Sequence, residues 1–321
     1  MRVRRSRPMI RDRFRAATLW RVKILAKVVL SRLPVSYTTW RKFGIFRLGY
    51  MDSPAYAMAA FDRNTSRLRR PVDAQGDDSL GVFDLDPAFG MERPALDGAR
   101  LLELGPGEML FSAVLARAAG AASIVAVDVG DNTSRSLDRY HELDRLISDR
   151  WGVDVGVCHA RSLDDILERC HAAYLTQGLD SLRSLDSASI DVAWSHAVLE
   201  HVAEPQLPEL LRELRRVMAP DGVASHQVDL RDHLDEALNN LRFAHRVWES
   251  KLLARSGFYT NRVGFRQMLE LFREAGFDAE VTRIDYWDQL PTPRERLAPE
   301  FRSRPEEDLL VNGFDVVLRP I

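Results

Sequence analysis

Apolar and polar positions from residue 99 onward fall into two alternating patterns, one typical of buried strands and one typical of helices. The short apolar runs that predict strands are 100–104, 123–128, 153–159, 190–195 and 223–228. The segments with helical spacing are 111–119, 137–150, 164–174 and 207–218, and the last has apolar side chains at 207, 210, 211, 214, 217 and 218. Alternation of this kind predicts an α/β fold, with a mostly parallel sheet covered by helices on both faces.

The C-terminal part continues this pattern after an interruption. A polar segment over 232–250 predicts a helical insertion, and 265–275 predicts a helix that Gly276 ends. Two further strands are expected at 279–286 and 314–318. We expect the segment from about 231 to 275 to cover a substrate, because it is large and follows the fifth strand.

Charge divides the chain into a basic arm and an acidic body. Residues 1–70 carry 18 Lys and Arg against three Asp, a net charge of +15, so the other residues carry −17 of the total −2. The apolar residues of 14–33 point in nearly every direction around a helical wheel. This favours a partly helical extension packed on the body with its arginines outward. Peripheral contact of residues 1–50 with an anionic membrane is the alternative.

The acidic segment 71–98 predicts a linker, since it contains four glycines and three prolines and shows no regular period. The organisation expected is therefore an extension over 1–70, a linker over 71–98 and one folded domain over 99–321.

Composition narrows the class of protein. With 45 % apolar and 29 % charged residues in 321, the chain is neither wholly disordered nor a collagen or coiled coil. Cys158 and Cys170 are the only cysteines, so we expect two buried packing residues and a reduced, cytoplasmic setting. Four basic residues interrupt the most apolar early stretch, 19–33, so no transmembrane helix is expected.

The strongest chemical signal is the segment Leu-Leu-Glu-Leu-Gly-Pro-Gly at 101–107, where the first strand turns into the first helix. Gly105 and Gly107 allow a tight turn and a close approach of a ligand to the backbone. The following helix begins near residue 111 and presents free N–H groups. Asp128 closes the second strand, where a carboxylate can accept hydrogen bonds from both ribose hydroxyls of a nucleoside cofactor.

Two classes of cofactor use this geometry. A dinucleotide site requires a third glycine three residues after Gly107, and Leu110 stands there. The sequence therefore favours S-adenosylmethionine, and a nicotinamide-dependent oxidoreductase is the alternative.

These segments resemble the class I S-adenosylmethionine-dependent methyltransferases over residues 99–230, and we expect the resemblance to continue to 321. The segments that carry the resemblance are Glu103-Leu-Gly105-Pro-Gly107, Asp128, Asp191-Val-Ala-Trp-Ser195-His-Ala-Val-Leu-Glu-His201-Val and Met218-Ala-Pro-Asp-Gly222. The resemblance implies a Rossmann-like sheet of seven strands, the seventh inserted antiparallel.

The resemblance also implies roles for single residues. Glu103, Gly105 and Gly107 would form the first cofactor motif and Asp128 the ribose contact, and Ser195 and His196 would lie near the sulfonium. Two positions depart from the family pattern. Met109 stands where a third glycine is common, and the acid expected after the third strand is not evident among residues 159–164.

Candidate bases come from the segment 225–233, which holds two histidines and two carboxylates within eight positions. We predict His226 as the base, with His196 or Asp229 behind it. A solvated loop and a metal site of His226, Asp229 and His233 are the alternatives. His201 is either structural or functional.

The function expected is O-methylation of a small-molecule, sugar or lipid-linked glycan acceptor. No recognisable RNA-binding module is present, so we expect no nucleic-acid partner. A further alternative is a non-catalytic, membrane-associated protein that binds the cofactor, in which the basic arm would carry the function.

Overall fold

The computed structural model describes residues 2–6, 52–66, 92–254 and 256–321. Most of the basic arm, including the helix expected within 14–33, and most of the 71–98 linker lie outside these residues. None of the helices in the described ranges combines the length and the apolar character that a membrane span requires.

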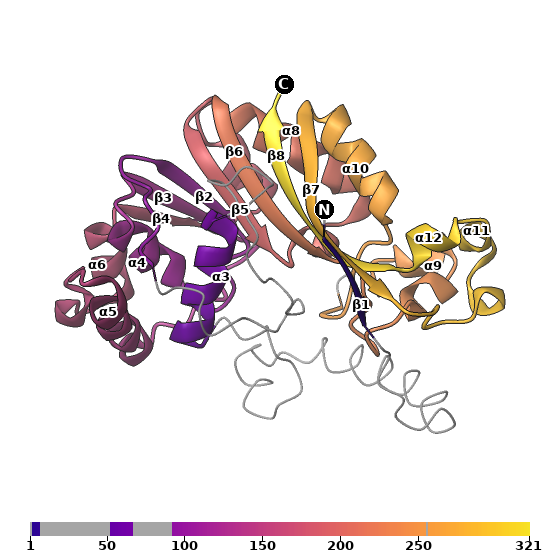
Figure 1. The fold of residues 1–321 in the computed structure, drawn as a ribbon, viewed down its shortest axis with the longest axis horizontal. Coiled ribbons are helices and arrows are strands. Elements are labelled where there is room, and N and C mark those ends of the chain that lie inside the picture. Colours follow the sequence, from indigo (N-terminus) through magenta and orange to yellow (C-terminus); the bar gives the residue numbers. More distant parts are fainter. Residues whose placement is uncertain (1, 7–51, 67–91, 255) are drawn as a thin grey trace.

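One mixed sheet runs through the described part of the chain, in the order β1-β7-β8-β6-β5-β2-β3-β4 (Figure 1). Its pairs are parallel except the two that β8 forms with β6 and β7. The expected number of seven strands is present as β2–β8, six of them at the predicted positions, and β1 adds an eighth, beside β7, that no sequence pattern indicated. The strands are β1 (Arg2–Ser6), β2 (Arg100–Leu104), β3 (Ser123–Val127), β4 (Ala172–Leu175), β5 (Ile190–His196), β6 (Met218–Asp229), β7 (Phe277–Trp287) and β8 (Val311–Pro320).

Helices cover both faces of this sheet, as predicted. Leu101 and Leu102 are adjacent in β2 but belong to different apolar clusters, so both faces are buried. One cluster joins the sheet to α3, α4, α5 and α6, and the other joins it to α7, α8 and α10. The helices are α3 (Pro54–Ser66), α4 (Phe111–Ala118), α5 (Leu137–Trp151), α6 (Leu163–Arg169), α7 (Leu179–Arg183), α8 (Leu207–Val217), α9 (His245–Trp248), α10 (Phe265–Glu274), α11 (Pro299–Arg302) and α12 (Glu306–Leu309).

Helix α3 belongs to this body although it precedes residue 99. Ala57, Met58 and Phe61 lie in the same apolar cluster as α4 and α5. The Phe61 ring stands edge-on to Trp194 of β5, with 5.4 Å between the ring centroids. Because it packs across the sheet, α3 can bring its own polar side chains to the strands.

The prediction for the third strand is wrong. Residues 153–159 form a loop and a short 3-10 turn. The third strand is β4, which overlaps the end of the expected helix 164–174, while α6 forms the first part of that helix. The valines at 153, 155 and 157 alternate as in a strand, but they pack under α5 from an irregular connection. The four residues of β4 are too few to show a period of their own, although they pair in parallel with β3.

The prediction of a helical insertion over 232–250 is also mostly wrong. Its helical parts are the short turn Asn239–Arg242 and α9, and the rest is irregular. The Asp232 carboxylate accepts hydrogen bonds from the backbone N–H groups of Leu234, Asp235 and Asn239. Such local bonds compete with a helix and favour a turn.

The structure differs from the sequence predictions in two smaller ways, at Cys158 and at residues 220–222. Cys170 is buried as expected, but Cys158 is exposed. The expected turn at Pro220-Asp221-Gly222 is an irregularity within β6, where the pairing with β5 shifts register.

Candidate active site

The turn after β2 is shaped by its two glycines. Gly105 has φ +66° and Gly107 has φ +75°, a backbone region that other residues rarely adopt. A Cβ on Gly105 would lie 2.5 Å from Cγ2 of Val198, so this turn touches the loop after β5. A Cβ on Gly107 would meet nothing within 4 Å, which leaves the backbone there open to a ligand.

Glu103 supports this turn from within the fold. Its carboxylate accepts hydrogen bonds from the Ser112 hydroxyl of α4 and from Nε1 of Trp194 in β5, the latter at 3.1 Å. Burial is the main cause that raises the pKa of Glu103 to about 7. The residue predicted to bind the cofactor therefore ties together the elements that carry the glycine turn.

The end of β3 presents Asp128 beside an exposed apolar side chain. Asp128 is half-buried, its Oδ1 accepts a hydrogen bond of 2.6 Å from the N–H of Val129, and burial raises its pKa. Val129 is 84 % exposed, unusually for a large apolar residue. The Gly178 N–H donates to the Asp128 carbonyl at 2.8 Å, so the loop after β4 lies against this end of β3.

Residues 159–164, where no acid was evident, do not follow the third strand in the structure. Asp164 is exposed in α6, which precedes β4, whereas the loop that follows β4 is Thr176-Gln177-Gly178. Val129 was missed as well. Its signal was an apolar residue directly after Asp128, the predicted ribose contact.

The last two residues of β5 point to opposite faces of the sheet. Ser195 is fully buried, and its hydroxyl lies 2.7 Å from Nδ1 of His226. His196 lies on the α3 side, with its Nε2 3.2 Å from the hydroxyl of Tyr56. Of the two residues predicted near the sulfonium, only His196 therefore faces α3.

His226 lies within β6, not in the loop after it. Its ring is fully buried and nearly parallel to that of Phe272 in α10, with 6.4 Å between centroids. Burial lowers the pKa of His226 to about 3, which keeps the ring neutral. A ring enclosed in this way cannot take a proton from an acceptor, so this geometry does not support the predicted base.

Asp229 ends β6 with its carboxylate already engaged. The guanidinium of Arg231 donates to both of its oxygens, at 2.9 and 2.7 Å. Both carboxylate oxygens are thus occupied by Arg231, whose backbone N–H also donates to Oδ1, so Asp229 is tied to the loop that follows β6 and does not face an acceptor.

A second histidine pair lies beside the segment after β5. The rings of His201 and His233 stack, with Nε2 atoms 3.1 Å apart, and Nδ1 of His201 lies 2.9 Å from the Tyr259 carbonyl. That carbonyl can only accept, so Nδ1 of His201 carries the proton. His201 is exposed at its edge, yet desolvation by the atoms around it lowers its pKa.

The structure does not bring together the predicted metal ligands His226, Asp229 and His233. Among the described residues, one other group has the spacing of metal ligands, Glu204, His245 and Glu249. The guanidinium of Arg262 lies 2.9 Å from Nδ1 of His245 and 3.5 Å from the Glu249 carboxylate. This guanidinium already supplies the positive charge that a metal ion would bring to these carboxylates.

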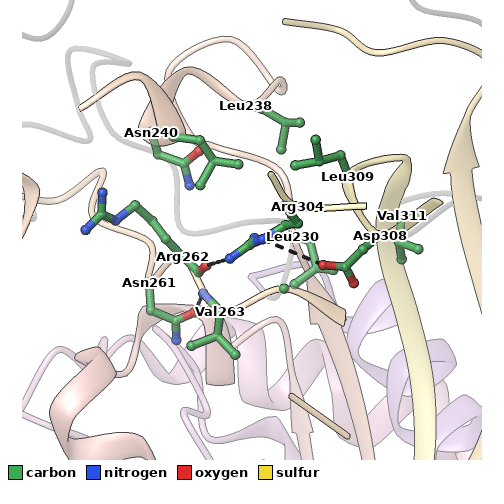
Figure 2. A pocket seen from close by; sticks show the side chains of 12 residues that line it. Leu230, Leu238, Asn240, Asn261, Arg262, Val263, Arg304, Asp308, Leu309 and Val311 are labelled. Carbon is green, nitrogen blue, oxygen red and sulfur yellow. Dashed lines mark hydrogen bonds and ion pairs between the residues drawn. The ribbon is translucent and has the colours of Figure 1, made fainter. Parts of the chain in front are cut away.

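The region after residue 230 is fastened to the site. The side-chain amide of Asn261 donates to the carbonyls of Leu199 and Val202, at 2.8 and 3.0 Å. Figure 2 shows a neighbouring pocket, in which Arg304 lies between the backbone of Arg262 and the Asp308 carboxylate. Polar bonds therefore hold residues 230–264 and 304–311 together over the end of β6.

Comparison with known proteins gives one family and a set of similar folds. Residues 83–282 match the family model described as "Methyltransferase domain". No curated protein matches the chain.

Similar solved structures include an S-adenosylmethionine-dependent methyltransferase from Methanosarcina mazei, with 16 % identity, coverage of 70 % of this chain and 93 % of that one, and a TM-score of 0.40. One from Mesorhizobium loti has 17 % identity, the same coverages and a TM-score of 0.38. An arsenic(III) methyltransferase from Chlamydomonas reinhardtii has 18 % identity, coverage of 71 % and 65 %, and a TM-score of 0.38.

Proposed function

We propose that this chain methylates a hydroxyl group of a small-molecule, sugar or lipid-linked glycan acceptor. The chain belongs to the methyltransferase-domain family, whose model matches residues 83–282. The chain is a methyltransferase, and its methyl donor is S-adenosylmethionine. This assignment decides against a nicotinamide-dependent oxidoreductase and a non-catalytic protein. The observation that carries the proposal of a hydroxyl acceptor is the contact between His196 and Tyr56 at the end of β5.

The residues present fit the cofactor. The open space above Gly107 allows a ligand to approach the backbone, and the half-buried carboxylate of Asp128 suits ribose hydroxyls. The exposed Val129 offers an apolar surface to the adenine ring of the cofactor. When bound, S-adenosylmethionine supplies an electrophilic methyl group.

Tyr56 and His196 act in this proposal as a two-residue base. The acceptor oxygen forms a bond to the methyl carbon as the carbon–sulfur bond breaks. The hydroxyl proton passes to the Tyr56 oxygen, and Tyr56 gives its own proton to Nε2 of His196. Correct alignment of the two reactants can account for about 7–11 kcal/mol of the barrier.

The covering segment and the basic arm complete the proposal. The bonds that fasten Asn261 and Arg304 beside the end of β6 support an acceptor cover over about 231–275. The charge of residues 1–50 supports peripheral contact with an anionic membrane, where a lipid-linked acceptor would be found.

The cofactor assignment is tested with Asp128→Ala. Loss of hydrogen bonds between a charged group and the ribose hydroxyls should weaken binding by about 1.5–3 kcal/mol, roughly 10- to 100-fold. Calorimetry with S-adenosylmethionine and S-adenosylhomocysteine measures this. Asp131→Ala, which removes an exposed carboxylate three residues further on, is the matched control. Equal affinity in the Asp128 variant and the control would contradict the ribose role.

The base assignment is tested with Tyr56→Phe and His196→Ala. Both should slow methyl transfer about 10²–10⁴-fold, because general base catalysis is lost, while affinity for the cofactor stays constant. The measurement is single-turnover transfer of labelled methyl to the best hydroxyl acceptor from a phenol and sugar panel. His159→Ala removes an exposed histidine and serves as control. An unchanged rate in both variants would remove this pair from the mechanism.

A further inference from the structure

We propose that a buried polar seam beneath α3, made by Arg63, Gln227, Arg283 and Asp315, binds an anionic oxygen group of the methyl acceptor. This inference rests on the proposed function and names a substrate class for it, an acceptor that carries a carboxylate or phosphate as well as the hydroxyl.

The seam continues directly from the proposed base. His196 pairs in register with Gln227 of β6, Gln227 with Asp315 of β8, and Asp315 with Arg283 of β7. Side chains paired in register lie on the same face of a sheet, so these four form one row across four strands.

Helix α3 lies over this row. The Tyr56 hydroxyl reaches His196 at one end, and the Arg63 guanidinium reaches Asp315 at 3.5 Å. Seven residues of a helix span about 10 Å, close to the two strand spacings, about 9.6 Å, between His196 and Asp315. The helix therefore carries one residue to the transfer position and another to the seam.

The seam contains buried polar atoms that have no hydrogen-bond partner. Arg63, Gln227 and Arg283 are 3 %, 1 % and 4 % exposed. The atoms without a partner are Nε and Nη1 of Arg63, Oε1 and Nε2 of Gln227, and Nη1 of Arg283. Native proteins pair nearly all such groups, and unpaired ones concentrated in one layer indicate a functional site.

The chemistry of these atoms selects the ligand. The five atoms carry seven N–H hydrogens and only one acceptor, the Gln227 carbonyl oxygen. A carboxylate or phosphate offers acceptors only, and guanidinium groups bind such oxygens with planar, charge-assisted bonds. A neutral hydroxyl or amide would place further donors against donors.

The existing ion pairs leave part of each guanidinium available. Arg283 donates through Nε and Nη2 to the Asp285 carboxylate, so only its Nη1 lacks a hydrogen-bond partner, whereas Arg63 has both Nε and Nη1 without one. Arg63 and Arg283 approach the Asp315 carboxylate at 3.5 and 3.7 Å, whereas charge-assisted bonds are usually about 2.7–2.9 Å. By contrast, Nη2 of Arg231 lies 2.7 Å from the carboxylate of Asp229 at the end of β6. An entering anion could therefore gain short bonds to both arginines without breaking short ones to Asp315.

Two contacts between the last turns of α3 and the strands are long. The apolar side of α3, with Ala57, Met58 and Phe61, is anchored in the core, whereas Arg63 meets Asp315 at 3.5 Å and Ser225 meets Asn64 at 3.4 Å. A small shift of the last turn of α3 would admit the anionic group. The row then places that group roughly 5–10 Å from His196, the size of a small hydroxy acid or hydroxy phosphate ester.

The experiment follows thermal unfolding of the full chain saturated with S-adenosylhomocysteine. The probes are 4-hydroxybenzoate and 4-hydroxyphenyl phosphate, and the neutral 4-hydroxybenzamide has the same shape as the carboxylate probe. At least one anionic probe should raise the unfolding temperature by about 5 °C, and the amide should not. Which of the two acts identifies the anionic group as carboxylate or phosphate.

Variants separate the seam from other basic surfaces. Arg63→Gln and Gln227→Leu should weaken binding of the anionic probe at least tenfold, and Arg319→Gln, on the exposed end of β8, should not. Gln227→Leu removes buried atoms that have no partner, so it should fold at least as stably as the parent without a probe. This keeps the test decisive if Arg63→Gln is unstable.

Three results would overturn the proposal: no shift with either anionic probe, an equal shift with the amide, or full probe binding by Gln227→Leu. Calorimetry with S-adenosylhomocysteine on the same samples separates this outcome from failure of the proposed function. If the cofactor binds and the anions do not, only the seam proposal fails.

Discussion

Gly105→Ala will lower the free energy of unfolding by about 2–5 kcal/mol and reduce affinity for S-adenosylhomocysteine more than tenfold. The left-handed backbone at φ +66° costs a residue with a Cβ roughly 1–2 kcal/mol. Its Cβ would also lie 2.5 Å from Cγ2 of Val198, and such overpacking costs about 1–3 kcal/mol. Val198 cannot easily move away, because it is β-branched and Asn261 holds the carbonyl of the next residue, Leu199. Urea unfolding and calorimetry measure the two effects.

Two further variants separate strain from contact. Gly105→Ala combined with Val198→Ala should recover the part of the loss caused by overpacking and retain the backbone strain. Gly107→Ala should cost only about 1–2 kcal/mol of stability, since its Cβ would meet no atom of the protein. It should nevertheless weaken cofactor binding, because that Cβ would enter the space through which we expect the ligand to approach. A Gly105→Ala protein as stable as the parent would refute the close contact with Val198.

His226 should make the protein sensitive to acid. In the unfolded chain this histidine takes a proton near pH 6.5, whereas burial keeps the folded ring neutral down to about pH 3. Between these values the unfolded state binds more protons, so the contribution of His226 to stability falls as the pH falls, by about 1.4 kcal/mol per pH unit. The loss should reach about 3 kcal/mol between pH 6.5 and pH 4.

The comparison that isolates this effect is with Ser195→Ala combined with His226→Leu, which removes the titrating ring and its hydroxyl partner together. Glu103 acts in the opposite direction, because burial raises its pKa to about 7 and its ionisation destabilises the fold as the pH rises from 4.5 to 7. Both proteins contain Glu103, so the difference between their free energies of unfolding removes its contribution. Urea unfolding from pH 4 to pH 8 gives this difference. If it does not change with pH, His226 is not the buried neutral ring that this structure contains.

Local sequence patterns alone predicted the candidate cofactor site. Gly105, Gly107 and Asp128 lie within single strand-to-loop transitions, where backbone conformation and residue type specify the structure without distant partners. The spacing of strands and helices likewise determined a mostly parallel sheet with helices on both faces, and the resemblance to methyltransferases supplied its seven-stranded form. Strand β4 was not predicted because four residues are too few to establish a period. Strand β1 was not predicted because its hydrogen bonds come from β7, far along the chain.

Which polar residues come into contact depends on how the whole chain packs. A period of two shows that neighbouring side chains in a strand face opposite ways, but it does not say which face each one takes. For this reason His226 was indistinguishable from a catalytic histidine until β6 placed it against Phe272, on the face opposite Gln227 and the seam. The contact of Tyr56 with His196 joins residues 140 positions apart and depends on α3 crossing the strands. A local sequence pattern cannot predict such a contact, because it forms only when the whole chain packs.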